Sequence, residues 1–286
     1  MLNAETYFVP TPAIPASDKL AIAQFRKALK QPKAPQAKNI KLDNTYILHE
    51  TATVVVLASG FTKPSANAKT GPMIQIWILN KAENPMESVL SGSDSNNCLN
   101  CFFRPALFHD ALQQGLIPQG SKRCYVNKSK APRSLWVKFT KGGYTALPSI
   151  ELFRHKSVRF GAYGEPVLIP LEIVASIVDV AKMHTGYTHD WRNPLRSGYK
   201  RFFMASTMES DYAEAKRLGW RAFSVATQSN GADSLCPASH EFRAAHPGRK
   251  PIQCIDCGLC SGLSRKDSHG QLIENRARDI FIPAHA

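Results

Sequence analysis

The chain has 286 residues, of which 36 are Lys or Arg and 22 are Asp or Glu, so that its formal net charge is +14. Its apolar runs at 52–61 and 73–79 have the length of strands, which predicts a soluble protein with no membrane span. The excess of basic residues favours a polyanionic partner, namely nucleic acid, a phosphorylated substrate or an acidic protein, over a neutral one. A solvated basic surface is the alternative interpretation.

The N-terminal part is interpreted as an extension followed by a hairpin. Residues 1–40 contain one predicted helix at 17–30, where an apolar stripe follows a Ser-Asp cap, and a linker at 31–38. Two β-rich segments, 51–61 and 73–80, are separated by a loop rich in Pro, Gly and Lys. This pattern predicts a β-hairpin.

From about residue 135 the pattern changes to short strands that alternate with helices. The sequence predicts helices at 170–184 and 210–218, and strands at 157–163, 186–188, 202–206, 221–226 and 279–283. Such alternation indicates βαβ units, a parallel sheet and an α/β fold. Because functional groups collect at the carboxyl ends of parallel strands, we expect the site among the polar residues found there: Glu165, Thr188, His189, Asp190, Ser206, Thr207, Thr227, Gln228 and His285.

The seven cysteines fall into two groups without remainder. The first group is Cys98, Cys101 and Cys124; the second is Cys236, Cys254, Cys257 and Cys260. Three plus four thiols indicate two metal centres, one with an open coordination position and one with four protein ligands. The C-x2-C-x2-C spacing of the second group is typical of [4Fe-4S] clusters in bacterial ferredoxins. Structural zinc is the competing prediction, and disulfides are disfavoured by the odd total and the spacing, which suit a reducing cytoplasm.

Over residues 95–286 the order of these features resembles a protein family. The features are the three cysteines ending in Cys124-Tyr, a strand ending in Gly-Glu165-Pro, the segment Phe-Met-Ala-Ser206-Thr207, and the block from Cys236-Pro-Ala-Ser to Cys260-Ser-Gly. They resemble the radical-SAM-like iron–sulfur proteins of phages and mobile elements. The resemblance implies a partial (β/α) barrel over residues 41–286, with a C-terminal four-cysteine segment at about 232–264, in a host cytoplasm.

The resemblance also implies a cofactor site. Cys98, Cys101 and Cys124 would hold a [4Fe-4S] cluster whose fourth iron binds S-adenosylmethionine. Glu165 would accept a hydrogen bond from its amino group, and Ser206 and Thr207 would contact its carboxylate or ribose. The implied activity is generation of a 5'-deoxyadenosyl radical, with a second [4Fe-4S] cluster and a reductase or flavodoxin-type electron donor. The spacing differs from the C-x3-C-x2-C of that family. Two residues separate Cys98 from Cys101, and 22 residues that include a predicted helix separate Cys101 from Cys124.

A basic segment with aromatic neighbours suggests the substrate. Arg192, Arg196, Lys200 and Arg201 alternate with Trp191, Tyr199 and Phe202, a pattern that suits a polynucleotide strand. Nucleic acid or a nucleotide is therefore the first hypothesis for the substrate. Two other functions remain open: a non-enzymatic nucleic-acid-binding protein with structural zinc or Fe–S sites, and an Fe–S redox or sensor protein.

Overall fold

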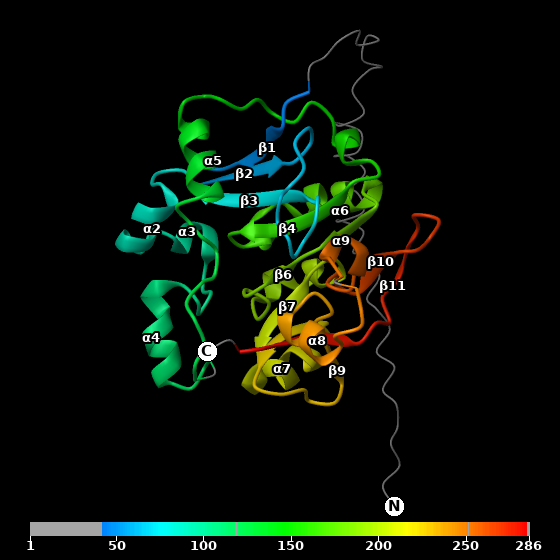
Figure 1. The fold of residues 1–286 in the computed structure, drawn as a ribbon. Helices are drawn as coiled ribbons and strands as arrows, with labels where there is room; N and C mark the ends of the chain where they lie inside the picture. Colours follow the sequence, from blue (N-terminus) through cyan, green and yellow to red (C-terminus); the bar gives the residue numbers. More distant parts are fainter. Residues whose placement is uncertain (1–41, 118, 251, 285–286) are drawn as a thin grey trace, which may run out of the picture. The chain divides into compact units, whose positions relative to one another are not determined.

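The computed structural model describes residues 42–117, 119–250 and 252–284 (Figure 1). Residues from 40 onward form one compact unit. The helix predicted at 17–30, its linker and His285 lie outside the described residues.

The first sheet has five strands in the order β1-β2-β3-β4-β5. β1 is Thr45–Glu50, β2 is Val54–Ser59, β3 is Ile74–Asn80, β4 is Ser157–Tyr163 and β5 is Met183–Thr185. β2 and β3 are antiparallel, which confirms the predicted hairpin, and β1 adds a strand that was not predicted. β3, β4 and β5 are parallel. Val54 to Ala58 are all buried, as expected for a run of β-branched and aliphatic residues within a sheet.

The second sheet has the order β6-β7-β8-β12-β9, and all of its neighbouring strands are parallel. β6 is Tyr187–Thr188, β7 is Met204–Met208, β8 is Ala222–Ala226, β9 is Asp233–Leu235 and β12 is Asp279–Pro283. Gly186 alone separates β5 from β6, so the chain passes directly from the first sheet into the second. A Cβ at Gly186 would lie 2.8 Å from the Phe203 ring, which explains the glycine.

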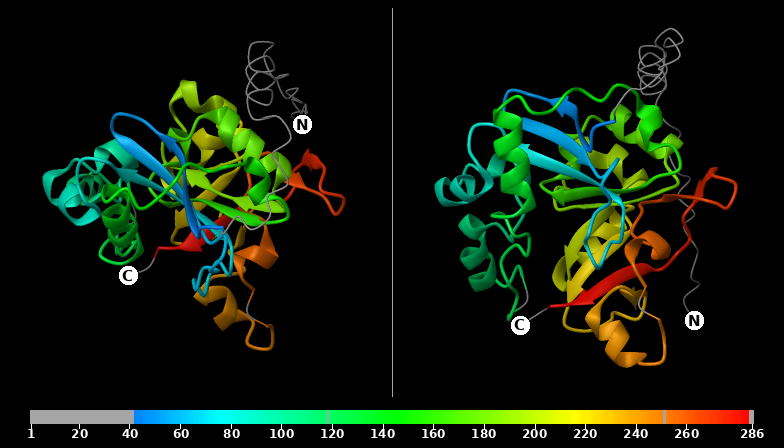
Figure 2. Two further views of the ribbon diagram at one scale, coloured as in Figure 1. Left: turned by 90° about the horizontal axis from the view of Figure 1, so that it is seen from above. Right: turned by 45° about the horizontal axis from the view of Figure 1, so that its top comes forward.

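Helices and 3-10 turns connect the strands (Figure 2). In α6, Leu171–Val180, the buried residues Ile173, Val174, Ile177 and Val178 recur at the spacing of one helical face. The other helices are α2 (Pro85–Ser91), α3 (Ser95–Cys98), α4 (Pro105–Gln113), α5 (Ala131–Thr140), α7 (Tyr212–Arg217), α8 (His240–Ala245) and α9 (Cys254–Cys257). The 3-10 segments are η1 (Ile150–Phe153), η2 (Pro166–Leu168), η3 (Pro194–Arg201) and η4 (Glu209–Asp211). The ribbon β10 (Ser264–Lys266) to β11 (Leu272–Glu274) stands apart from both sheets.

The prediction of a parallel α/β fold is confirmed, and two of its details change. The helix predicted at 170–184 is wrong beyond Val180, because Ala181 is extended and Met183–Thr185 pairs with β4 as β5. The strand predicted at 202–206 lies at Met204–Met208. The described strands form two five-stranded sheets and the two-stranded ribbon β10–β11, and no closed barrel. None of the helices in the described ranges has the length and apolarity to cross a membrane.

Candidate metal centres

The loop that carries Cys98 is held between the carboxyl ends of β3 and β4. The Asn97 side chain donates from Nδ2 to the Ile78 carbonyl at 3.1 Å, and the Asn97 carbonyl accepts from the Glu165 amide at 2.7 Å. Gly164 has a φ of 84°, and a Cβ there would lie 2.5 Å from the Ile78 carbonyl oxygen. Only glycine allows this approach without strain. Asn97, directly before Cys98, is therefore fixed to β3 by its side chain and to the end of β4 by its backbone.

Cys101 and Cys124 join Cys98 through further backbone contacts. The Cys101 amide donates to the Cys98 carbonyl at 3.2 Å, and the Cys124 amide donates to the Phe103 carbonyl at 2.9 Å. The long insertion that contains α4 thus leaves from the first group and returns to it. Leu99 has a φ of 48°, a conformation that costs a non-glycine residue about 1–3 kcal/mol and that is found preferentially at functional sites.

A buried ion pair keeps this loop rigid. Arg104 donates from Nε and Nη2 to one oxygen of Asp94, at 3.0 and 2.7 Å, and both side chains are buried. Arg104 also donates to the carbonyls of Leu99 and Gly92. The guanidinium therefore connects the segment before Cys98, at Gly92 and Asp94, with Leu99 after it.

The thiols of the first group lie close enough to influence one another. Burial, followed by the charges of Cys101, Cys124 and Glu165, raises the pKa of the Cys98 thiol well above its usual value. Without a cation this thiol stays protonated, whereas a bound metal stabilises the thiolate. The structure therefore brings together all three predicted ligands of the first centre.

Glu165 lies at the end of β4 beside the first group and is buried. Its carboxylate accepts from Thr188 Oγ1 at 2.7 Å, from the His189 amide at 3.2 Å, and pairs with His189 Nδ1 at 2.5 Å. Burial alone would lower the pKa of His189, but Cys101 and Glu165 outweigh it and raise that pKa well above its usual value.

Two buried polar atoms next to Cys98 lack a partner. Asn97 Oδ1 and the Tyr163 hydroxyl have no well-formed hydrogen bond within the described ranges, although the two side chains are neighbours. Burial raises the pKa of the Tyr163 hydroxyl, so it remains a neutral donor. A cluster sulfide or a ligand oxygen at the first centre would satisfy such a donor, since buried polar groups are normally hydrogen-bonded.

The second group is assembled from three separate parts of the fold. The Cys236 amide, just after β9, donates to the Phe281 carbonyl of β12 at 2.9 Å. The Cys254 amide donates to the Lys69 carbonyl in the β2–β3 loop at 2.9 Å. The Cys260 carbonyl accepts from the Gly186 amide at the β5–β6 junction at 2.9 Å.

Arg221 fastens this segment to the second sheet. It is buried, and its Nη1 and Nη2 atoms donate to the carbonyls of Ser261 and Arg278, the latter at 2.7 Å. Burial and the thiols of Cys236, Cys254 and Cys257 raise the pKa of Cys260 well above its usual value, against the opposing charge of Arg221. All four predicted ligands of the second centre therefore lie near one another.

The thiols of each group lie near one another, but their arrangement is not that of a site for one metal ion. Within the described ranges, no three or more His, Cys, Asp or Glu side chains are drawn tightly enough together to hold one metal ion. The thiols of a [4Fe-4S] cluster stand at the corners of a larger group than a single ion, and each centre offers the all-thiolate donors that Fe–S clusters prefer. The all-thiolate donors and the unpartnered Tyr163 hydroxyl beside Cys98 thus fit such a cluster.

The chain was compared with known protein families, curated proteins and solved structures. No model of a known family, no curated protein and no solved structure matches the chain.

Ser206 and Thr207 lie on opposite faces of β7. Met204 packs with the second cysteine group, and Met208 packs with α4. Ser206 lies between these two residues in the strand, so its side chain is on the same face of β7 as theirs. Thr207 lies on the other face, where its hydroxyl makes a 2.8 Å hydrogen bond with Ser224. Of the two, Ser206 has the placement that a contact at this site requires.

The predicted basic segment follows β6 and forms η3. Arg192 stacks on Trp191 and pairs with Asp211 at 2.9 Å and with Glu214 at 2.8 Å. Arg196 pairs with Asp190 at 3.3 Å. Partly exposed ion pairs of this kind contribute little stability.

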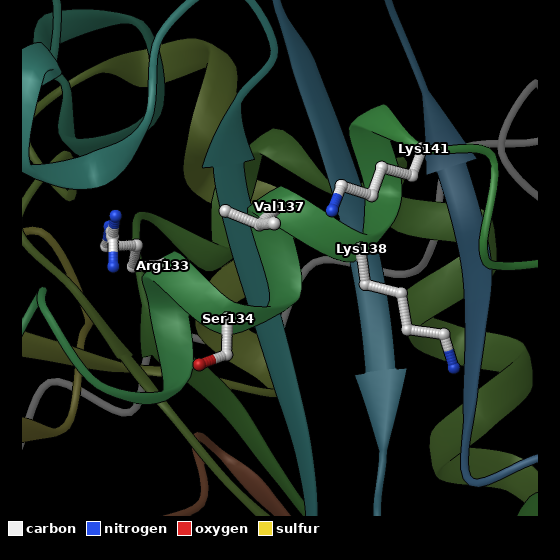
Figure 3. A pocket seen from close by; sticks show the side chains of 5 residues that line it. All are labelled: Arg133, Ser134, Val137, Lys138 and Lys141. Carbon is white, nitrogen blue, oxygen red and sulfur yellow. The ribbon is translucent and has the colours of Figure 1, made fainter.

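A second basic surface was not predicted. Arg133, Ser134, Val137, Lys138 and Lys141 line a shallow hollow on α5 and at its end (Figure 3). No cysteine, histidine or carboxylate lines this hollow, so it is a surface feature separate from the two cysteine groups.

The close approach at Gly164 gives a test of how the first centre is positioned. We expect Gly164→Ala to cost more than about 2 kcal/mol, lowering the Tm by at least about 4–8 °C and reducing metal at the first centre, because the added Cβ pushes the Asn97–Cys98 turn off the sheet. Gly231→Ala is the matched control, since Gly231 has a φ of 83° but open space around its Cβ position. Equal Tm values and equal metal contents for the two variants would show that the close approach does not position Cys98.

Proposed function

We propose that this protein is an iron–sulfur protein with two [4Fe-4S] centres, the first of which binds S-adenosylmethionine as in radical-SAM enzymes. The observation that carries the proposal is the position of Cys98, Cys101 and Cys124 beside the buried pair Glu165–His189, at the carboxyl ends of β4 and β6. Three thiols leave one position open there, whereas the second group offers four. Iron is favoured over zinc because two residues separate Cys257 from the cysteine on each side of it. This spacing suits three corners of a cluster.

Each group of residues has a separate task in this proposal. The seven cysteines hold the clusters, Glu165 accepts from the amino group of the cofactor while it orients His189, and Ser206 contacts the cofactor from β7. The bound cofactor supplies an organic radical when it is cleaved reductively. The two sheets would form the arcs of a partial (β/α) barrel of the radical-SAM type. A reductase or a flavodoxin-type protein would donate electrons in the cytoplasm of a phage host.

Metal analysis of anaerobically purified protein tests the proposal. We expect a brown protein with about eight iron and eight sulfide per chain, which binds S-adenosylmethionine and cleaves it to 5'-deoxyadenosine on reduction. A colourless protein that contains zinc would instead select the non-enzymatic nucleic-acid-binding alternative. A brown protein that does not bind the cofactor would select an Fe–S redox or sensor protein.

The segment Arg192–Arg201 supports nucleic acid as the proposed substrate class. We expect binding to single-stranded DNA or RNA to weaken steeply with salt, and the replacement of Arg192, Arg196 and Lys200 by Ala to reduce the log–log slope by about one unit per lost phosphate contact. The control replaces Arg133, Lys138 and Lys141 on α5, which removes the same charge. A slope that changes only in the α5 variant would move the contact to α5, and an affinity independent of salt would exclude nucleic acid.

A further inference from the structure

Arg159 lies in the middle of β4 and makes no ion pair with a carboxylate of the described residues. Its Nη2 donates to the Tyr125 hydroxyl at 3.0 Å, and its Nη1 reaches Gln75 Oε1 at 3.5 Å. Both partners are neutral. Arg159 is only partly exposed to solvent, and a guanidinium in such a position is normally matched by an anion, because an uncompensated charge away from water is costly.

The neutral partners hold Arg159 in one orientation. Gln75 is buried and donates from Nε2 to Thr70 Oγ1 and to the Met73 carbonyl, which turns its Oε1 toward Arg159. Gln75 and Arg159 are also register partners in β3 and β4. A guanidinium presents five donors in a rigid fork, and these contacts fix that fork while leaving donors for a further acceptor.

Two phenols complete the surroundings. The hydroxyls of Tyr125 and Tyr187 lie 3.0 Å apart, so that Tyr125 links Tyr187 to Arg159. The ring of Tyr187 stacks on Phe223 with the centroids 4.9 Å apart, which fixes it in place. Tyr125 is 73% exposed, so the cluster is open to solvent on that side.

The cluster lies between the two cysteine groups. Tyr125 directly follows Cys124 of the first group. In the second group, Cys254 and Cys260 pack against the same core cluster as Tyr187 and Phe223. A ligand held by these side chains would therefore be adjacent to both candidate centres.

We propose that Arg159, Tyr125 and Tyr187 form a binding site for an oxyanion, the phosphate or carboxylate group of a small molecule. The fork of Arg159 matches the two oxygens of such a group, and the phenol that does not donate to the other adds an O–H donor. The alternative role for Arg159 is to balance the thiolates of the second group through Cys254. The support for the site is the set of contacts described above. The further step, that the bound oxyanion belongs to the substrate, rests on the proposed function.

Calorimetric titration with inorganic phosphate and, separately, with acetate tests the site on the purified full-length protein with its metal in place. We expect one of the two anions to bind saturably, Arg159→Gln to weaken that binding at least tenfold, and Tyr125→Phe and Tyr187→Phe to weaken it several-fold. Arg159→Lys keeps the charge but not the fork, so its affinity should fall between those of the wild type and Arg159→Gln. The anion that shows this dependence identifies the group as phosphate or carboxylate.

The controls separate the possible roles of Arg159. Arg154→Gln removes one positive charge from an exposed position nearby in the chain and should leave the affinity unchanged. Iron, zinc and sulfide contents should be the same in Arg159→Gln as in the wild type. The proposal is overturned if neither anion binds, if Arg159→Gln binds as tightly as the wild type, or if Arg159→Gln loses the metal of the second group. Because no step requires enzymatic activity, failure of the proposed function leaves this test intact.

Discussion

Cys254→Ala is expected to destabilise the protein by more than about 5 kcal/mol, which lowers the Tm by about 10–20 °C for a domain of this size. The second centre connects β9 through Cys236, the β2–β3 loop through the backbone at Cys254, and the β5–β6 junction through Cys260. Loss of the proposed metal would weaken all three connections at once. Cys98→Ala should cost less, because the Cys98 loop is also held by the Asn97 contacts and by the Arg104–Asp94 pair.

Thermal melting of the two variants, with metal analysis of each, checks this order. A wild-type sample treated with a chelator serves as the control, and its Tm should fall to that of Cys254→Ala. If both variants melt at the same temperature, or if the chelator leaves the wild-type Tm unchanged, the second centre does not have the structural role assigned to it.

Much of the scaffold can be predicted from the sequence, because its signals are local. The apolar runs that form β2 and β3, the strand at 157–163 and the two cysteine groups all follow from periodicity and spacing. The helix predicted as far as 184 shows the limit of such signals. The apolar pattern of α6 continues beyond Val180, and only the pairing of Met183–Thr185 with β4 ends the helix.

The contacts within the site could not be predicted in this way, because they depend on the meeting of distant strands. Glu165 was selected as a strand-end carboxylate, but its hydrogen bonds with Thr188 and His189 depend on the passage of the chain through Gly186 into the second sheet. The sequence shows Arg159 only as the end of a basic run with Arg154, His155 and Lys156, a pattern that is equally typical of a solvated surface. Its site becomes visible only when Tyr125 and Tyr187 are placed beside it.

Glu165→Gln is expected to weaken the binding of S-adenosylmethionine by about 1.5–3 kcal/mol, or roughly 10- to 150-fold, while the cluster stays in place. Thr188 and His189 already provide three donors to this carboxylate, which has about four acceptor positions, so one position remains for the amino group of the cofactor. The amide of Gln removes the negative charge and faces these donors with a single acceptor oxygen. Both changes disfavour a bound ammonium group.

Equilibrium binding to reconstituted protein, with iron and sulfide determined on the same samples, distinguishes a cofactor role for Glu165 from a purely structural one. Glu172→Gln, which removes a carboxylate from the first turn of α6, is the matched control and should bind the cofactor as the wild type does. A Glu165→Gln protein that loses its first cluster would show that the Glu165–His189 pair supports the cysteines rather than the cofactor. If wild-type protein with an intact first cluster neither binds nor cleaves S-adenosylmethionine, the radical-SAM proposal is wrong, and the two centres belong to a redox or nucleic-acid-binding protein.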